Sequence, residues 1–437
     1  MSADKNVVII GTGIFGTSTA LYMLEKGGYN VTMLDKCGIL PAPDAASTDL
    51  NKIVRAGDYA DPAYAQLAID AVELWKKPEW DGCYHESGVI CLSSPDKPEG
   101  AQFVKSAFTN LKAASIDATL VPDTASIKSH FEPSIPTGSF GSRQGYSNPV
   151  GGWAEAGRAV EVGLARVRQL GGTIRAGAEV VALQVGGDGK TVEAVTLEGG
   201  EDISCDLLVC AAGAWTPKLF ASSGIAARSP PVNATGQSVA TVQLTPEEME
   251  TYSKVPVVFN LDDGFYVFPP NPQGLVKFAI HAAGYTNSSP DSNGVSVPRT
   301  KLTPGAEDGM IPLEKLQKLR AGLAEVYPEL AKKDLVSTRL CWYCDTISGD
   351  WLIDYHPDYT NLVLATGGSG HAFKYYPIIG REILKVIEHD PPKEFAHRWS
   401  FGYDGADAGA DVRVDTVKEL KLDDLASADD LRVSVTA

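Results

Sequence analysis

The sequence predicts an α/β fold in which two domains are interleaved along one chain of 437 residues. Three observations indicate this fold. Residues 7–35 read as a strand, a helix and a second strand around a glycine-rich turn. Two further apolar runs, 206–215 and 361–368, end in small residues and resemble buried parallel strands. Between these segments lie stretches that alternate as the strands of an antiparallel sheet do.

The first strand and its turn have the form of a Rossmann-type, dinucleotide-binding unit. Residues 7–10 are apolar and β-branched, and Gly11, Gly13 and Gly16 follow in a GxGxxG pattern. Gly11 allows the tight turn, Gly13 lets the backbone approach a pyrophosphate, and Gly16 lets the next helix pack closely on the sheet. We expect that helix, at residues 17–26, to direct its positive end at the phosphates.

Asp35 ends the second strand, where a carboxylate accepts hydrogen bonds from the adenosine ribose. The order strand, turn, helix, strand and acid is more specific than the glycines alone. The alternative is a glycine-rich loop of another α/β fold. Lys36 follows Asp35, so NADP stays open at this point.

Further helices and strands can be predicted along the rest of the chain. Apolar residues at helical spacing predict helices at 61–77, 154–170 and 376–389. Residues 173–185 alternate as a strand and lead into a hairpin around 186–189. Shorter alternating stretches, typical of an antiparallel substrate domain, occur at 255–260, 266–269 and 275–280.

We therefore expect a discontinuous dinucleotide-binding domain and a mostly antiparallel α+β substrate domain. The first comprises residues 1–83, 149–230 and 339–395, and the second residues 84–148 and 231–338. Residues 396–437 form an acidic C-terminal extension, either partly disordered or lying over the molecule as a strap.

Composition restricts the class of function. Apolar residues make up 44% and charged residues 21%, as in soluble globular proteins, and no apolar run approaches the roughly 20 residues of a membrane span. A net charge of −17 disfavours nucleic acids and anionic membranes as partners. The seven cysteines lack the spacing of a zinc site and suit free thiols in a reducing compartment. We expect no metal site and a monomer.

Both ends of the sequence favour the cytoplasm. No signal peptide precedes Val7, and the last three residues are not a peroxisomal SKL-type signal.

Several motifs spread over the chain resemble those of one family. They are Ser-Thr-Asp-Leu-Asn-Lys-Ile-Val-Arg at 47–55, Tyr-His-Glu-Ser-Gly at 84–88, Tyr-Val-Phe-Pro at 266–269, Lys-Phe-Ala-Ile-His at 277–281, Cys-Trp-Tyr at 341–343, Asp-Tyr-His-Pro at 354–357 and Gly-Gly-Ser-Gly-His-Ala-Phe-Lys at 367–374. With the N-terminal turn, they resemble the flavoprotein amine oxidases that include monomeric sarcosine oxidase, pipecolate and saccharopine oxidases and the fungal fructosyl-amino-acid oxidases (amadoriases).

The resemblance implies a sarcosine-oxidase-like, two-domain flavoprotein that binds FAD covalently. Cys341 matches the cysteine that bonds to the flavin 8α-methyl group, and Cys344 is the competing candidate. A small buried hydrophobic residue is the ordinary interpretation of either cysteine. Further cofactor contacts fall on Ser47, Lys52, Val180, Gly213, Gly368, Gly370, Phe373 and Lys374.

The resemblance also implies a catalytic lysine. Lys277 matches the lysine beside flavin N5, where a fixed cation stabilises the charge that develops on O₂. Alternation places Lys277 and His281 on one strand face and apolar residues 276, 278 and 280 on the other. His281 could orient the substrate. A surface lysine and a structural histidine are the alternatives.

Arg55 and Lys374 match the two cations that hold the substrate carboxylate in sarcosine oxidase. A guanidinium offers bidentate hydrogen bonds and an ammonium adds a point charge. Tyr266 and Tyr343 are expected to line the same substrate site. Taken singly, each cation could also be an ordinary surface charge.

The expected function is oxidation of the C–N bond of a secondary-amine amino acid of the sarcosine, pipecolate, saccharopine or N-methyl type. The resulting imine hydrolyses, and O₂ is reduced to H₂O₂. An amadoriase is the alternative, but amadoriases carry an Asp-Glu pair where this chain has Ile280 and His281. A biosynthetic oxidase of N-alkylated amino acids, a nicotinamide-dependent dehydrogenase and a non-catalytic nucleotide-binding protein also stay open.

Overall fold

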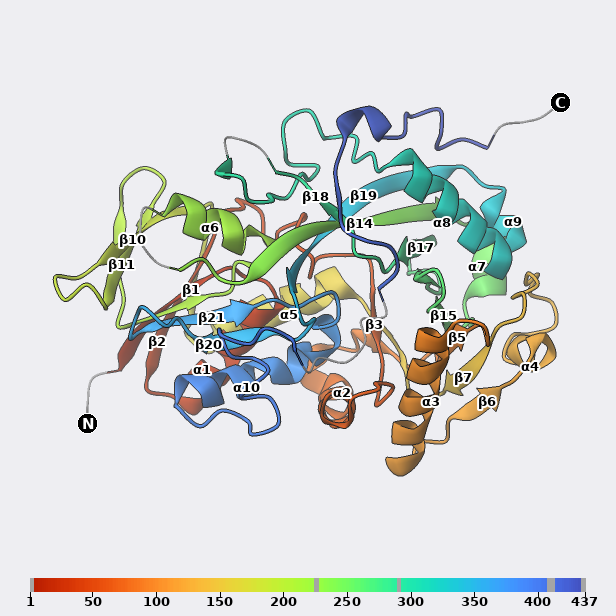
Figure 1. Cartoon of the computed structure of the whole chain (residues 1–437), viewed down its shortest axis with the longest axis horizontal. Coiled ribbons are helices and arrows are strands. Elements are labelled where there is room, and N and C mark those ends of the chain that lie inside the picture. The colour runs from red at the N-terminus through yellow and green to blue at the C-terminus, as the bar shows by residue number, and fades with distance from the viewer. Residues whose placement is uncertain (1–3, 224–227, 289–291, 407–412, 434–437) are drawn as a thin grey trace.

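The computed structural model describes residues 4–223, 228–288, 292–406 and 413–433 (Figure 1). One part of the molecule is built on a six-stranded sheet with the order β20-β21-β13-β1-β2-β9. All neighbours are parallel except β20 and β21. The strands are β1 (Lys5–Ile10), β2 (Tyr29–Asp35), β9 (Thr173–Ala176), β13 (Leu207–Cys210), β20 (Leu352–Tyr355) and β21 (Leu362–Thr366).

Helices cover one face of this sheet. They are α1 (Ile14–Lys26), α5 (Ala156–Gln169), α10 (Tyr376–Ile387) and, beside them, α2 (Pro62–Trp75). Val7 and Ile9 of β1 point into their common core, with Leu21 and Ile379 from the helices. The predicted helices are present, but α1 begins at Ile14 rather than at residue 17, because the glycine turn passes directly into the helix.

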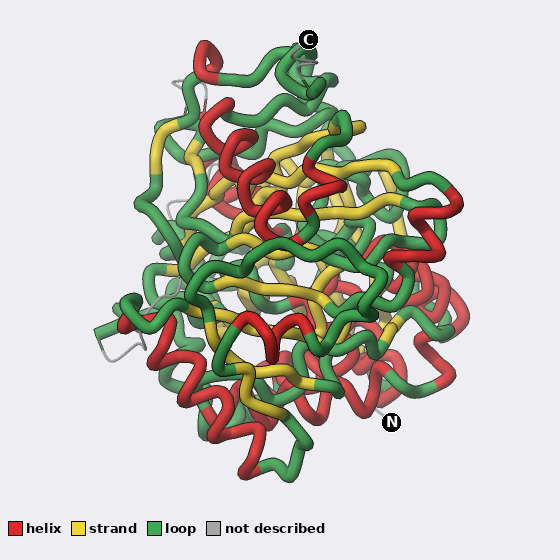
Figure 2. Tube along the Cα trace, turned by 90° about the vertical axis from the view of Figure 1, so that its right-hand side faces the viewer, coloured by secondary structure: helices red, strands yellow, loops and turns green. Residues whose placement is uncertain are grey.

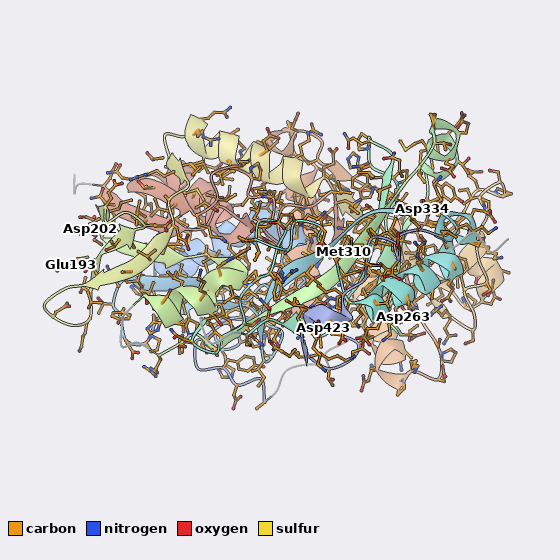
Figure 3. All side chains as sticks on the ribbon, turned by 90° about the horizontal axis from the view of Figure 1, so that it is seen from above. Glu193, Asp202, Asp263, Met310, Asp334 and Asp423 are labelled. Atoms are coloured by element: carbon orange, nitrogen blue, oxygen red, sulfur yellow. The ribbon has the colours of Figure 1, made fainter. Side chains whose placement is uncertain are left out.

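A three-stranded antiparallel sheet of β10 (Val180–Val185), β11 (Val192–Leu197) and β12 (Asp202–Ser204) covers the other face. Val8 and Ile10 pack against it. The strand predicted at 173–185 is two strands, because Gly177, with a φ of 67°, turns the chain between the two sheets. In Figure 3, Glu193 and Asp202 mark this end of the molecule, whereas Asp263 and Asp334 lie toward the opposite end.

The second part contains a ten-stranded, mostly antiparallel sheet with the order β22-β18-β14-β17-β16-β15-β5-β7-β6, and β19 also pairs with β14. Only β5–β15 and β18–β22 are parallel among these pairs. The strands are β5 (Val89–Ser93), β6 (Thr119–Val121), β7 (Gln144–Asn148), β14 (Val232–Gln243), β15 (Val257–Asn260), β16 (Phe265–Val267), β17 (Leu275–Ile280), β18 (Tyr285–Thr286), β19 (Leu335–Thr346) and β22 (Lys418–Glu419). The predicted α/β class with a parallel and an antiparallel part is confirmed.

Helices pack on this sheet, and Figure 2 shows strands in the interior of the molecule with helices around them. They are α3 (Pro98–Ala113), α4 (Thr124–Lys128), α7 (Pro246–Tyr252), α8 (Leu313–Val326) and α9 (Pro328–Ala331), while the short α6 (Thr216–Ser222) lies near β10 and β14. Phe278 of β17 packs beneath α8 with Leu319 and Leu323. The exact boundaries of the two domains stay a prediction; β19, which crosses the predicted boundary at residue 339, lies in the ten-stranded sheet.

A small sheet of β3 (Lys52–Val54), β8 (Gly152–Ala154) and β4 (Tyr84–His85) lies between the two parts. It sets the position of Lys52 and of Arg55, which follows β3 directly. Residues 413–433 run across the ten-stranded sheet: β22 pairs with β18, and the Ala426 N–H donates to the Ile311 carbonyl at 2.9 Å. Figure 3 shows Asp423 of this strap and Met310 in the middle of the molecule.

Candidate active site

A cavity of about 430 Å³ opens at the carboxyl ends of the central parallel strands. Its wall contains Ile10 and the turn after β1, Asp35 at the end of β2, Ala211 after β13 and Gly368 after β21. Ligands of doubly wound α/β proteins bind at this edge of the sheet. The position therefore fits a nucleotide cofactor.

The turn after β1 is shaped to receive phosphate. Gly13 is the N-cap of α1, and no side chain caps this helix end, so its backbone donors are available. Gly11 has a φ of 104°, and a Cβ atom there would lie 2.4 Å from the Ala211 carbonyl oxygen. A Cβ atom at Gly16 would lie 2.1 Å from the Gly11 carbonyl oxygen, so α1 can pack this closely on the turn only because residue 16 is a glycine.

Asp35 is held at the rim of the cavity. Its Oδ2 accepts hydrogen bonds from the Thr12 backbone N–H at 3.0 Å and the Thr12 hydroxyl at 2.7 Å. Lys36 lies over the Trp215 ring, 4.2 Å from its centroid. Both residues line the cavity.

Most residues predicted from the sequence as cofactor contacts line this cavity, and so does Tyr343, predicted for the substrate. They are Gly11, Gly13, Asp35, Ser47, Lys52, Val180, Gly213, Gly368, Gly370 and Phe373. Gly16, Cys341 and Lys374 do not line it, nor do Arg55, Tyr266, Lys277 and His281. Cys341, Lys374, Arg55, Tyr266, Lys277 and His281 belong to the groups of contacting residues described next.

Lys277 belongs to a buried group of charges around Asp49. The Asp49 carboxylate lies 2.9 Å from Lys277 Nζ, 3.1 Å from Lys52 Nζ and 3.0 Å from the Arg339 guanidinium. Burial alone would raise the pKa of Asp49, but Arg339, Lys277 and Lys52 hold it well below its ordinary value. Burial lowers the pKa of Lys277 to about 8, although Asp49 opposes this shift.

Cys341 lies beside this group. Its Sγ is 3.5 Å from Lys52 Nζ, and Lys52 reaches the cavity. Cys344 lies on the cavity wall, but its Sγ is 3.2 Å from the Thr366 hydroxyl, and burial raises its pKa to about 12. Of the two thiols, Cys341 therefore has a neighbouring cation, and Cys344 lacks one in its described surroundings.

Arg55 and Lys374 are brought together by Tyr59. The Arg55 guanidinium carbon and Lys374 Nζ each lie 4.9 Å from the Tyr59 ring centroid, and Lys374 Nζ donates to the Tyr59 hydroxyl at 2.5 Å. The His371 imidazole contacts the same hydroxyl at 3.3 Å. Both cations are buried. Burial, and to a smaller extent the positive charge of Arg55, lower the pKa of Lys374 well below its ordinary value.

Aromatic rings connect this pair to the cavity wall. Phe259 lies 5.6 Å from the Arg55 guanidinium and 6.3 Å from the His281 ring, and His281 lies 6.3 Å from Tyr343. A Cβ atom at Gly370 would lie 2.4 Å from the Tyr343 ring and 3.1 Å from His281 Cε1. Burial raises the pKa of Tyr266 to about 12, and Lys52 opposes this shift.

The comparisons with known proteins agree with this geometry. The family model described as FAD dependent oxidoreductase matches residues 6–385. The chain belongs to this family. It is an FAD-dependent oxidoreductase, and the family resemblance stated from the sequence motifs is confirmed.

Named relatives cover nearly the whole chain. L-saccharopine oxidase of Schizosaccharomyces pombe is 31% identical over 92% of this chain and 94% of its own length. Amino acid oxidase imqH of Aspergillus flavus is 30% identical over 89% and 93%. Among solved structures, fructosamine oxidase (Amadoriase II) of Aspergillus fumigatus is 25% identical with a TM-score of 0.79, covering 98% of this chain and 97% of its own. Fructosyl peptide oxidase of E. terrenum is 26% identical with a TM-score of 0.83, covering 97% and 98%.

The cavity of this oxidoreductase fits FAD. The uncapped start of α1 would hold the pyrophosphate and Asp35 the ribose, while Lys52, Tyr343 and Gly370 would surround the flavin end. No helix in the described parts of the chain is both long and apolar enough to cross a membrane. In the same parts, no three His, Cys, Asp or Glu side chains gather as metal ligands would.

Sequence reasoning missed four residues of the site: Asp49, Asp58, Tyr59 and Arg339. Asp49 lies in a quoted motif without an assigned role, and Asp58 and Tyr59 follow Arg55 in the loop before α2. Arg339 precedes Cys341 by two residues and therefore shares its strand face. The sequence places all four residues in or next to a motif, but this position alone does not indicate which residues they contact.

Proposed function

We propose that this FAD-dependent oxidoreductase oxidises the C–N bond of a secondary-amine amino acid and uses O₂ as electron acceptor. The observation that carries the proposal is the buried pair Arg55 and Lys374 around Tyr59. In a chain with a net charge of −17, two buried cations that share a single buried carboxylate, Asp58, favour an anionic ligand. The carboxylate of an amino acid is such a ligand.

The substrate would bind with its carboxylate between the Arg55 guanidinium and the Lys374 ammonium. His281, Tyr343 and Phe259 would form the walls that hold its carbon skeleton. FAD, held in the cavity, would supply the acceptor for the two electrons removed from the C–N bond, with O₂ as the final acceptor. The protein contributes orientation, exclusion of water and fixed charge.

Lys277 would assist the reaction with O₂. It is fully buried, and Asp49 and the Asn51 carbonyl fix its ammonium in place. A preorganised cation stabilises negative charge on O₂ without rearrangement of solvent. Its pKa near 8 leaves it mostly protonated at neutral pH.

Attachment of FAD through Cys341 is the second part of the proposal. Cys341 Sγ lies 3.5 Å from the Lys52 ammonium, which reaches the cavity, and the neighbouring residues Trp342 and Tyr343 line the cavity. Cys344 is the weaker candidate for the flavin bond, because its thiol lies within hydrogen-bonding distance of the Thr366 hydroxyl and burial raises its pKa.

An amadoriase activity is the second candidate, because solved structures of fructosamine and fructosyl peptide oxidases share the fold. The pocket argues against it. Ile280 is buried in the core beneath α8, and His281 takes the position that faces Tyr343. Neither residue offers a carboxylate to sugar hydroxyls. Relatives named L-saccharopine oxidase and sarcosine oxidase support the simpler amino acids.

One experiment separates these activities. Peroxide release from the purified yellow protein would be measured with L-pipecolate, sarcosine, other N-methyl amino acids, saccharopine, fructosyl-valine and fructosyl-lysine. Turnover of the non-glycated secondary amino acids alone supports the proposal, and turnover of only the fructosyl compounds overturns it. Colourless protein that reduces a nicotinamide would also contradict it. The monomeric state and cytoplasmic location stay predictions.

A further inference from the structure

Asp58 is a fully buried carboxylate that the proposed reaction does not use. It lies in the loop between β3 and α2, with an exposed fraction of 0%. Its Oδ2 has a hydrogen bond of 3.4 Å from the Tyr146 hydroxyl, and its Oδ1 has no hydrogen-bond partner among the described residues. A buried carboxylate with an unfilled acceptor is costly, so its retention calls for a reason.

Two cations act on Asp58, and they are the pair proposed above to bind the substrate carboxylate, Arg55 and Lys374, here called the clamp. Arg55 and Lys374 are the two cations that stabilise its ionised form. In the described part of the chain, Arg55 Nη1 also lacks a hydrogen-bond partner. The group is therefore two cations and one anion, buried together, with an unused donor and an unused acceptor. A ligand that carries one negative charge would bring this group to neutrality.

We propose that Asp58 is a specificity-determining residue: it leaves the Arg55 and Lys374 clamp with one net positive charge, so that the site accepts a single carboxylate there and rejects a pair of carboxylates. This inference rests on the proposed function. A second anionic group would face Asp58 in a water-poor pocket, where repulsion between like charges is strong. Amino acids whose further carboxylates lie far from the clamp stay acceptable.

The surroundings of Asp58 make its own charge measurable. It faces Arg55 and Tyr59 from its loop, Tyr84 from β4, Cys91 from β5, Tyr146 from β7 and Lys374 from the 3₁₀ turn at Phe373–Tyr375. Burial raises the pKa of Asp58 to about 6, with Arg55 and Lys374 opposing the shift. Burial raises the pKa values of Tyr59, Tyr84, Cys91 and Tyr146. Asp58 is the carboxylate of this set, and with a pKa of about 6 it changes charge between pH 5 and 7.

The test compares two anions that stay ionised over this pH range, methanesulfonate and methanedisulfonate. Their dissociation constants are measured from the change in the flavin absorption spectrum of the holoenzyme, for the natural protein and for Asp58→Asn. At pH 7 the ratio of the two constants should shift toward the disulfonate by on the order of tenfold in the variant. Asp61→Asn, three residues further along, is the matched control, because asparagine also caps α2 well.

Acidification gives a second measurement that needs no variant. As the pH falls from 7 to 5, Asp58 gains a proton, and the ratio in the natural protein should approach that of Asp58→Asn. A pH effect that does not act through Asp58 should appear in both proteins alike. Equal ratios at pH 7, or a ratio in the natural protein that ignores pH, overturns the role of Asp58 while amine oxidation persists. If neither anion perturbs the flavin and no amino acid is oxidised, the clamp and the proposed function fail together.

Discussion

The Lys277 ammonium lies 2.9 Å from the Asp49 carboxylate, although Lys277 belongs to the ten-stranded sheet and Asp49 to a loop 228 residues earlier in the chain. Asp49 precedes β3, and Lys277 lies on β17 of the ten-stranded sheet. The same carboxylate also binds Lys52 and Arg339. One acid therefore fixes three cations beside Cys341 and the cofactor cavity. Several of the following predictions depend on this arrangement.

Replacement of Lys277 by methionine should separate the two halves of the reaction. Reduction of the flavin by substrate should change little, whereas reoxidation by O₂ should slow by orders of magnitude, because the fixed positive charge is lost. Stopped-flow absorbance measures each half separately. Lys315→Met, which removes another buried lysine that pairs with Asp415, serves as the control. Unchanged reoxidation would remove Lys277 from this role.

The rate of reoxidation should depend on pH through Lys277. Burial lowers the pKa of this ammonium to about 8, so the cation predominates below pH 8 and the neutral amine above it. The rate constant should be high at neutral pH and fall as the pH rises through about 8. Rapid mixing of reduced enzyme with O₂ between pH 6.5 and 9.5 measures this profile. A rate constant that does not change across pH 8 would contradict the role of Lys277. In Lys277→Met the fall in rate near pH 8 should be absent.

Asp49→Asn should destabilise the folded protein by about 3 kcal/mol at pH 7, since it leaves three buried cations without their anion. The folded-state pKa of Asp49 is depressed, so its contribution is complete above the ordinary aspartate value of about 3.9 and is lost as the pH falls below it. Urea unfolding of the holoenzyme measures the difference. Asp81→Asn, at an exposed ion pair with Arg158, should cost under about 1 kcal/mol.

Cys341→Ser should release the flavin from the denatured protein, while Cys344→Ser should retain it. The physical reason is the Lys52 ammonium beside Cys341 and the raised pKa of Cys344. Flavin fluorescence of the band on a denaturing gel and the mass of the intact chain give the answer. The opposite pattern would assign the bond to Cys344, and release from the natural protein would exclude a covalent bond altogether.

Tyr59→Phe should raise KM for the amino acid by about tenfold with a smaller change in kcat. The ring that contacts both cations is kept, but Lys374 loses the hydroxyl 2.5 Å away, which costs about 1.4 kcal/mol. Steady-state peroxide assays measure both constants. Tyr285→Phe is the control and should leave KM unchanged, because the Tyr285 hydroxyl donates to Glu314 and neither residue lines the cavity.

The parallel half of the fold could be predicted because its signals are local. A β-branched run, a glycine turn and an acid in order leave few alternatives, and Gly11, Gly13 and Asp35 lie where this pattern places them. The alternation around Lys277 was equally informative: Val276 and Phe278 enter the core beneath α8, and Lys277 faces Asp49.

Long-range pairing could not be predicted in the same way. β14 contains Asn233, Thr235, Gln237 and Ser238 and lacks a clear apolar alternation, yet it pairs with β19 along most of its length. Thr235, Gln237 and Ser238 are nevertheless buried, and the Gln237 amide N–H donates a hydrogen bond to the Thr235 hydroxyl. The positions of Asp49 and Arg339 against Lys277 depend on this pairing, so no local pattern reveals them.

The order of strands in the six-stranded sheet has a consequence for synthesis on the ribosome. The central strand β13 needs both β1, which begins at Lys5, and β21, which ends at Thr366. The sheet that contains β1, the first strand to be synthesised, is therefore complete only after β21, one of the last strands, has been synthesised. A nascent chain of this protein exposes unpaired apolar strands for most of translation, and such chains are prone to aggregate. We expect its yield in a foreign host to depend on chaperones and on slow expression at low temperature more than on the final stability of the fold.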